Sequence, residues 1–229
     1  MVNKLSKNLQ KANKLIDKNR LYSIDDGLNI IRKVSFEKFN PSVEVSFNLN
    51  LNVKKASQQL RGAIVLPYGT GKTAKVLVVA DKNEQNEAKE AGADYVNDEL
   101  VLEKIQRENW FDFDYIVTTP KYMAKFAKYG KILGPKGLMP NPKLGTVTQD
   151  VKTAVLNIKK GQIEYRTNDQ GLINLPIGKL SFSNQELKAN YQAIFNLIKA
   201  KRPSEVKGEY IINIFLSTTM GPGIRIAKD

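Results

Sequence analysis

Hydrophobic residues near the start of the chain recur with the spacing of helices. Over residues 5–16 the period is that of a surface helix, and a second helix is expected behind Ser23, which precedes Asp26 by three residues in a variant of the capping box. The first apolar stripe consists of Leu5, Leu9, Ala12, Leu15 and Ile16, and the second consists of Leu28, Ile30, Ile31 and Val34.

The segment VEVSFNLNL at 43–51 alternates strictly between apolar and polar residues, which predicts a half-buried strand. Its outward residues are mostly uncharged donors and acceptors. This face suits either plain solvated surface or hydrogen bonding to a partner. The outward residues are Glu44, Ser46, Asn48 and Asn50.

A different pattern begins near residue 75. KVLVVA at 75–80 and DYIVTT at 114–119 are typical of fully buried strands, and ADYV at 93–96 of a shorter one. Helices are expected at 84–91, 98–108, 120–131 and 148–159. Strands that alternate with helices predict a parallel sheet covered on both faces, and hence a small α/β domain.

Alternation returns after Gly161, in QIEYRT at 162–167 and LINLPI at 172–177. The letters NDQG between them favour a tight turn that joins two antiparallel strands. A capping box, SNQE at 183–186, predicts another helix, and a last strand is expected at 209–217.

Neither flank of the α/β segment has enough strands and helices to form a domain alone. We therefore expect a discontinuous α+β domain built from residues 1–66 and 161–229, interrupted by an α/β domain at 67–160, with paired crossings near Pro67 and Gly161.

The net charge of the chain indicates what kind of partner it binds. The 229 residues include 36 Lys and Arg against 23 Asp and Glu, a formal charge of +13. Residues 1–67 and 160–229 hold 22 of the basic and 11 of the acidic residues, so most of the excess lies there. A charge of this sign favours encounter with nucleic acid or an anionic membrane.

No apolar run approaches the roughly 20 residues of a spanning helix, and the start of the chain lacks the apolar core of a secretory signal. Both observations favour a cytoplasmic protein without a membrane partner.

The chain has no cysteine and no histidine. This excludes disulfides, thiol nucleophiles, most zinc sites and every mechanism that rests on a His base. We expect no catalytic residue, no metal and no cofactor.

One motif suggests nucleotide hydrolysis, because LPYGTGKT at 66–73 ends like a phosphate-binding loop. Such a loop needs glycine five residues before Gly71, where this chain has Leu66, and it must lead into a helix rather than the expected strand. The inserted domain also lacks the Gly-x-Gly-x-x-Gly of a dinucleotide site. The motif is interpreted as a turn between domains with Lys72 solvated, and hydrolysis through Gly71, Lys72 and Thr73 stays as a rival hypothesis.

Three other segments have the chemistry of nucleic-acid contacts. YGKILGPKGLMPNPKLG at 129–145 contains four glycines, three prolines and three lysines but no acid, which predicts an ordered basic loop outside regular helix and strand. STTMGPGIRI at 217–226 offers hydroxyls and a thioether that can contact ribose, although an ordinary turn has the same letters. Lys38 and Phe39 place a cation beside an aromatic ring. Trp110, among acids, is expected in the core instead.

These segments together resemble one family. The signature GRILGPxGLxPNPKxGTV corresponds to GKILGPKGLMPNPKLGTV at 130–147, and further matches are GADYV at 92–96, FDFDYIVTTP at 111–120, GQIEYRTNDQG at 161–171 and STTMGPGIRI at 217–226. Over essentially its whole length the chain resembles the bacterial type of the large-subunit ribosomal protein L-one family, the universal stalk protein. Lys131 and Lys136 stand where arginine is frequent, which exchanges forked hydrogen bonding for a point charge.

The resemblance implies a fold and a set of contacts. The fold is a split α+β RNA-binding domain with an inserted Rossmann-like, three-layer α/β domain. The implied RNA contacts are Lys38, Phe39, Glu44, Ser46, Arg166, Thr167, Asp169, Gly171, Thr219, Met220 and Gly221, supported by Lys131, Lys136 and Lys143 in the basic loop.

The resemblance also implies the partners. These are the mobile stalk of 23S rRNA, deacylated tRNA that leaves the exit site, and the protein's own operon mRNA, whose translation bacterial members repress. The protein would be a cytoplasmic, ribosome-associated structural component, monomeric when free of the ribosome. A general binder of double-stranded DNA stays as the second rival, since the net charge alone would serve that function.

Overall fold

The computed structural model describes residues 6–97, 100–108 and 110–228. The chain divides into two compact units. The first, here the split unit, comprises Met1–Arg61, Leu66–Gly71 and Tyr165–Asp229, and the second, the inserted unit, comprises Gly62–Val65 and Lys72–Glu164.

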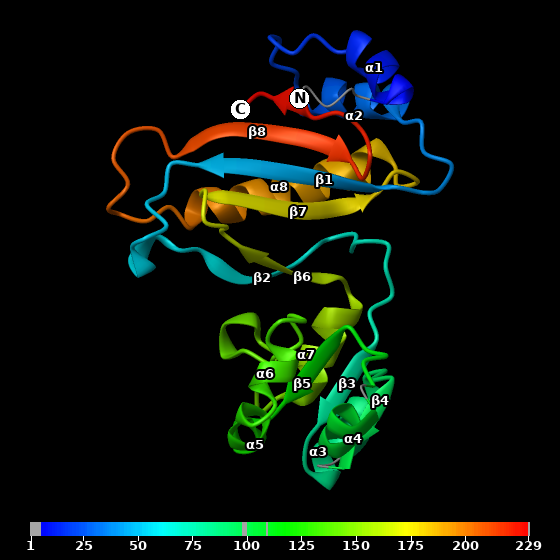
Figure 1. Ribbon diagram of the computed structural model, residues 1–229, viewed down its shortest axis with the longest axis vertical. Coiled ribbons are helices and arrows are strands. Elements are labelled where there is room, and N and C mark those ends of the chain that lie inside the picture. The colour runs from blue at the N-terminus through cyan, green and yellow to red at the C-terminus, as the bar shows by residue number, and fades with distance from the viewer. Residues whose placement is uncertain (1–5, 98–99, 109, 229) are drawn as a thin grey trace. The chain divides into compact units, whose positions relative to one another are not determined.

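The split unit is built on a four-stranded antiparallel sheet in the order β7-β1-β8-β9. The strands are β1 (Ser42–Leu49), β7 (Leu172–Lys179), β8 (Ile211–Thr218) and β9 (Ile224–Ile226). β1 lies between β7 and β8, so a segment from early in the chain is bonded on both sides to segments from its last third (Figure 1).

One face of this sheet is the core of the split unit. Alternate residues of β1 are fully buried, as the pattern predicts, and the ring of Phe47 stacks at 6.3 Å on Tyr191 of α8 (Asn184–Ala200). Helix α2 (Ile24–Val34) packs on β8 and β9, where Gly27 lies against Ile226. Figure 1 shows α8 behind β1 and β7. Both helices therefore cover the same face and leave the other open.

The helix starts follow the sequence signals. Ser23 Oγ accepts a hydrogen bond from the amide of Asp26, and Ser183 forms the predicted capping box with Glu186. The first helix is shorter than expected: α1 spans Lys7–Lys14, and Leu5 lies outside the described residues. Leu15 was expected on the buried stripe but is 65% exposed, because the 3.6-residue period puts it at the edge of the stripe that Leu9, Ala12 and Ile16 form.

The expected hairpin of QIEYRT and LINLPI is wrong. β6 (Gln162–Arg166) pairs with β2 (Arg61–Val65) in a separate two-stranded sheet, and β7 pairs with β1. The turn itself is ordered by Asn168, whose Oδ1 accepts hydrogen bonds from the amides of Gln170 and Leu172. Alternation shows which residues a strand buries, but it does not show which strand is its partner.

The inserted unit has three layers. Its parallel sheet has the order β4-β3-β5, with β3 (Val76–Val79), β4 (Tyr95–Asn97) and β5 (Tyr115–Thr118). α3 (Lys82–Glu90) and α7 (Val151–Lys159) share a core cluster with one face, and α4 (Leu100–Glu108) and α5 (Met123–Ala127) with the other. The mixed α+β and α/β fold class is thus confirmed.

Two details of the inserted unit differ from expectation. The helix expected at 120–131 consists of three pieces: a 3-10 turn η2 (Pro120–Tyr122), α5 and α6 (Gly130–Leu133). Glycine is a weak helix former, so the break before Gly130 agrees with its low propensity. The helix expected at 98–108 begins in residues outside the described ranges, and its described part is α4.

Residues 66–73, whose sequence resembles a phosphate-binding loop, form a connecting segment before strand β3. Gly71 has φ +71, and the chain then enters strand β3, so no helix N-terminus faces a phosphate here. Within the split unit, Asn190 of α8 holds this connection. Its side chain is fully buried, accepts a hydrogen bond from the amide of Tyr68 at 3.0 Å and donates to the carbonyls of Gly69 at 3.0 Å and Ile177 at 2.7 Å.

Replacing Asn190 by alanine is expected to destabilise the split unit by about 1–3 kcal/mol, because it leaves buried backbone groups without partners. Urea unfolding should show a lower midpoint with an unchanged slope. The matched control is Asn196→Ala, an exposed position on the same helix, which should change stability by less than about 0.5 kcal/mol. Equal effects of the two substitutions would refute the anchoring role of Asn190.

Candidate nucleic-acid interface

The open face of the split-unit sheet is polar and mostly uncharged. Strand register places the half-buried residues Glu44, Ser46 and Asn48 of β1 on this face. Their neighbours on β7 and β8 form three rows: Pro176–Glu44–Ser217, Asn174–Ser46–Phe215 and Leu172–Asn48–Asn213. The pairing of β8 with β9 extends the middle row from Phe215 to Arg225. Apart from the apolar Pro176, Leu172 and Phe215, the side chains in these rows can donate or accept hydrogen bonds.

The loop after β8 stands at one end of this face. Thr219 and Met220 are exposed, Met220 to 57%. Thr219 Oγ1 accepts a hydrogen bond from the amide of Ser42 at the start of β1, at 3.1 Å. A Cβ at Gly221 would collide with the hydroxyl of Thr218, so only glycine fits this turn without displacement. The predicted contacts of the loop are therefore presented to solvent from a fixed backbone.

A carboxylate fixes that backbone. Glu37 accepts hydrogen bonds from the hydroxyls of Thr218 and Ser35, both at 2.6 Å, and from the amides of Phe36 at 2.9 Å and Met220 at 3.4 Å. Partial burial opposes ionisation of Glu37, but these hydrogen bonds outweigh it and lower its pKa below the ordinary value. Glu37 joins the segment before β1 to the loop after β8, a role that sequence reasoning missed.

The structure brings Lys38 and Phe39 to the same end. Both are exposed, Phe39 to 53%, and they follow Glu37 directly in the chain. A cation, an aromatic ring, a threonine hydroxyl and a thioether thus lie around one fixed turn. The cation suits contact with a phosphate, the ring with a base, and the hydroxyl and thioether with a ribose.

The other predicted contacts lie at the opposite end of β1, roughly 25 Å away for a strand of this length. Arg166 and Asp169 are exposed there. Thr167 is only 7% exposed, and its hydroxyl accepts a hydrogen bond from the amide of Leu60 at 3.2 Å. Gly171 is buried with φ +78, and a Cβ there would lie 2.8 Å from the carbonyl oxygen of Leu49. The side chain of Thr167 and the backbone of Gly171 are thus occupied in shaping the turn.

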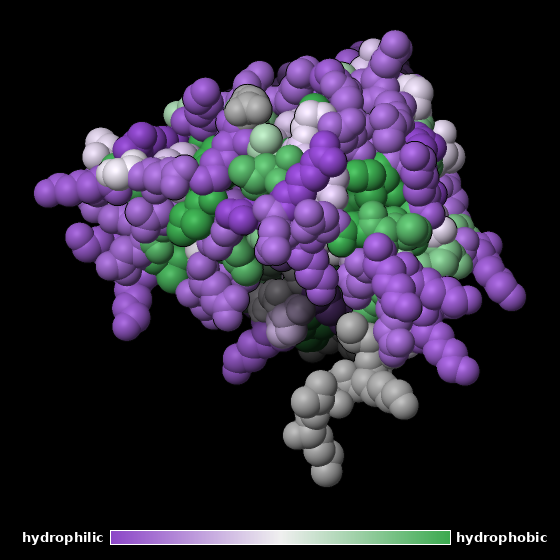
Figure 2. Space-filling view, turned by 90° about the horizontal axis from the view of Figure 1, so that it is seen from above, coloured by the Kyte–Doolittle hydropathy of each residue, from purple (hydrophilic) through white to green (hydrophobic). Residues whose placement is uncertain are grey.

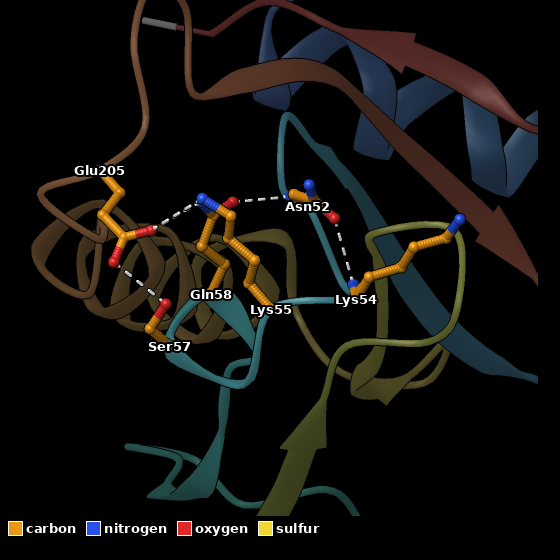
Figure 3. Close-up of polar contacts among 6 residues, drawn as sticks. All are labelled: Asn52, Lys54, Lys55, Ser57, Gln58 and Glu205. Atoms are coloured by element: carbon orange, nitrogen blue, oxygen red, sulfur yellow. Dashed lines mark hydrogen bonds and ion pairs between the residues drawn. The ribbon is translucent and has the colours of Figure 1, made fainter.

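A group of polar side chains fastens the neighbouring loops (Figure 3). Gln58, which is buried, accepts a hydrogen bond from the amide of Asn52 at 2.7 Å and donates to Glu205 at 3.2 Å. Ser57 donates to Glu205 Oε1, and Lys55 Nζ lies 3.8 Å from Glu205 Oε2, the oxygen that Gln58 contacts. Hydrogen bonds from Gln58 and Ser57 lower the pKa of Glu205. The loop after β1 is thereby tied to the loop before β8.

The supporting basic loop belongs to the inserted unit. Lys131, Lys136 and Lys143 are all exposed, and Lys136 Nζ lies 4.2 Å from the ring centroid of Phe111. Leu133 is fully buried, which confirms that the loop is ordered. The expectation that it contains no regular helix is wrong, because α6 and the 3-10 turn η3 (Pro142–Leu144) lie within it.

Sequence reasoning also missed Phe215 and Arg225. Both phases of β8 contain apolar residues, so the pattern alone does not show that Phe215 points to the open face while Ile214 and Leu216 are buried. Register with Ser46 is the observation that places Phe215 there.

Figure 2 shows the protein from the side on which Figure 1 draws α1 and α2, and hydrophilic residues dominate that surface. Of the helices in residues 6–97, 100–108 and 110–228, none has the length and apolar character needed to cross a bilayer. In the same ranges no three acidic side chains come together as metal ligands would.

A split α+β unit with an open polar sheet face, an inserted three-layer α/β unit and a charge of +13 define a class: a basic two-unit protein suited to nucleic-acid binding. The family follows from comparison. The model of the ribosomal protein L1p/L10e family matches residues 31–222, and the chain belongs to this family.

The relatives agree over nearly the whole chain. "Large ribosomal subunit protein uL1" of Mesoplasma florum is 53% identical over 223 residues, which cover 97% of this chain and 98% of the relative. The protein of the same name from Mycoplasma capricolum subsp. capricolum is 52% identical over the same shares, and that from Mycoplasmopsis pulmonis is 49% identical over 99% of both chains. The family is one of structural ribosomal proteins and not of enzymes, which confirms both the resemblance and the expectation of a non-enzyme.

Glu37→Gln is expected to lower the free energy of unfolding at neutral pH by about 1–3 kcal/mol, because glutamine lacks the charge that strengthens these hydrogen bonds. Since the folded-state pKa is lowered, the contribution of the carboxylate is full above the ordinary value of 4.5 and is lost as the pH falls through the folded value. The difference between wild type and variant should shrink as the pH falls below 4.5 in denaturant titrations.

Asp169→Asn, at an exposed carboxylate in the 168–171 turn, is the control and should have little effect on stability at any of these pH values. A Glu37→Gln effect that is the same at pH 7 and at low pH would contradict the account of Glu37.

Proposed function

We propose that the chain is a structural component of the large ribosomal subunit that binds the stalk region of 23S rRNA through the split unit. One observation carries this proposal above the others. The loop of Thr219, Met220 and Gly221 is fixed by Glu37 and exposed at the end of an uncharged polar sheet face. The names of the relatives, large ribosomal subunit proteins, support it.

The binding mechanism is recognition of RNA shape. Lysine and arginine side chains such as Lys38 and Arg166 neutralise phosphates and speed encounter. Hydroxyls of Thr219 and Ser46 hydrogen-bond ribose 2′-OH groups, and Met220 packs on a sugar or base face. Glu44 and Asp169 accept hydrogen bonds from ribose hydroxyls or base amino groups, which a phosphate cannot supply. No bond is made or broken.

Thr167 and Gly171 act differently in this proposal. Their own hydrogen bonds and backbone geometry shape the turn that presents Arg166 and Asp169. They contribute to the site through the conformation they impose on the turn. In this proposal one RNA fold contacts the sheet face at both ends of β1.

The inserted unit has a supporting role. Its exposed Lys131, Lys136 and Lys143 form a basic edge without acids between residues 115 and 149, suited to rRNA or to tRNA at the exit site. In this proposal the unit moves with the stalk as deacylated tRNA leaves. The protein is monomeric when free, works in the cytoplasm on the ribosome, and represses translation of its own mRNA by binding a similar RNA fold with the same face.

The boundaries of the two functional domains belong to the proposal as well. We assign RNA binding to residues 1–66 and 161–229 and the supporting role to 67–160. In the sheet of β2 and β6, both strands pass from one unit to the other. The boundary falls after Arg61 in β2 and after Glu164 in β6.

The double substitution Thr219→Ala and Met220→Ala tests the proposal. It should weaken binding of the 23S stalk hairpin by tenfold or more, since each lost hydrogen bond contributes about 1 kcal/mol and packing adds to it. Binding of random RNA should hardly change, because phosphate contacts remain. Filter binding or fluorescence anisotropy at several salt concentrations gives both affinities, and log affinity should fall by roughly 0.7–0.9 per phosphate contacted for each unit of log salt.

Ser204→Ala, in the exposed loop between α8 and β8, is the matched control and should bind both RNAs as wild type does. Equal losses for hairpin and random RNA would refute the specific role of the loop. Equal affinity of wild type for the hairpin and for duplex DNA would favour the general DNA binder, and phosphate release from ATP or GTP that Lys72→Ala abolishes would favour the hydrolase.

A further inference from the structure

A hollow opens where the sheet of the split unit meets the N-terminal helix. Its volume is about 310 Å³, at the lower end of the range of ligand sites. One wall comes from α1 and the residues after it, and the other from β8, β9 and the loop between them. The residues that line it are Leu9, Asn13, Ile16, Lys18, Phe215, Gly221, Pro222, Gly223 and Arg225.

Phe215 gives this hollow an aromatic wall. Its ring is 37% exposed although it lies in the middle of a strand, between Ser46 on β1 and Arg225 on β9. An aromatic ring at such a position presents a flat face on which a base can stack. The opposite wall includes Leu9 and Ile16, so a planar group would have apolar surface on both sides.

Among the described residues that line the hollow, the charged ones are both cationic: Lys18 and Arg225. Arg225 Nη2 donates to Asn213 Oδ1 at 2.6 Å, which fixes the guanidinium on the open face while other N–H groups of the fork stay available for a ligand. An aromatic wall with two cations and no acid is complementary to a nucleotide, which combines a flat ring with a phosphate.

The hollow is continuous with the predicted RNA contacts. Gly221 belongs both to the lining and to the loop of Thr219 and Met220, and Phe215 shares a row with Ser46. Gly223 has no side chain, and a Cβ there would point toward the ring of Phe215, so a ligand can approach the backbone of this wall closely. A strand of RNA on the open face can therefore turn one residue into the hollow without leaving the surface.

We propose that this hollow binds one unstacked nucleotide of the RNA that the open face holds. The base stacks on Phe215, and the phosphate lies between Lys18 and Arg225. This inference rests on the proposed function, and it adds a subsite whose aromatic ring, Phe215, and whose wall from α1 lie outside the motifs of the sequence.

The test combines protein variants with an abasic scan of the RNA. Phe215→Ser removes the ring, Phe215→Tyr keeps it, and Ile212→Ser is the matched control, an apolar residue with the same 37% exposure on the same strand. Affinities are measured for the 23S stalk hairpin and for a series in which each nucleotide in turn lacks its base. Urea unfolding of each variant confirms that it is folded.

We expect Phe215→Ser to weaken hairpin binding about tenfold, as for the loss of one stacked base, while Phe215→Tyr and Ile212→Ser bind as wild type does. One abasic position should weaken wild type by a similar factor and have no further effect on Phe215→Ser. Lys18→Gln should weaken binding and reduce the salt dependence by about one phosphate.

Two negative results are distinguishable. A wild-type protein that does not prefer the hairpin over random RNA overturns the proposed function itself. If wild type prefers the hairpin, two results overturn the nucleotide subsite alone. One is equal affinities of Phe215→Ser and Ile212→Ser, and the other is additive effects of Phe215→Ser and every abasic position.

Discussion

The pairing of β1 with both β7 and β8 is the constraint on which the split unit depends. Glu44 lies opposite Pro176 on one side and Ser217 on the other, so the sheet exists only when segments from before and after the inserted unit are in register. A slip of one residue would turn Val43, Val45 and Phe47 to solvent and bury Glu44. The same register that buries the core therefore creates the open polar face. Because these contacts are distant in sequence, the split unit is also expected to fold more slowly than the inserted unit, whose parallel sheet is continuous in the chain.

Polar anchors extend this order from the sheet to its loops. Glu37 holds the turn after β8, Gln58 and Glu205 join two loops at the other end, and Asn190 fixes the connection at Tyr68 and Gly69. A buried polar group is costly unless it is paired, and the buried Asn190 and Gln58 and the half-buried Glu37 each make two or more hydrogen bonds. Fixed loops lose little entropy on binding, which favours recognition of a folded RNA by its shape.

Much of this structure could be predicted from residues that act locally. The alternation of β1 gave its buried and open faces, Ser23 and Ser183 marked helix starts, and the apolar runs predicted the three-layer unit. What failed depends on contacts between distant residues. The partner of β6 is β2, the ring of Phe215 is outward although its neighbours are buried, and Thr167 is occupied by Leu60. Glu37 carries no motif at all, because its role arises only when the loop after β8 is folded against it.

The central claim is that one RNA surface is assembled from both ends of the chain. Hydrogen–deuterium exchange of the full protein, with and without the 23S stalk hairpin, tests it most directly. The account predicts that RNA slows amide exchange together in residues 35–48, 166–174 and 213–225. Slowing confined to one end of the chain, or to the basic loop at 129–145, would contradict it.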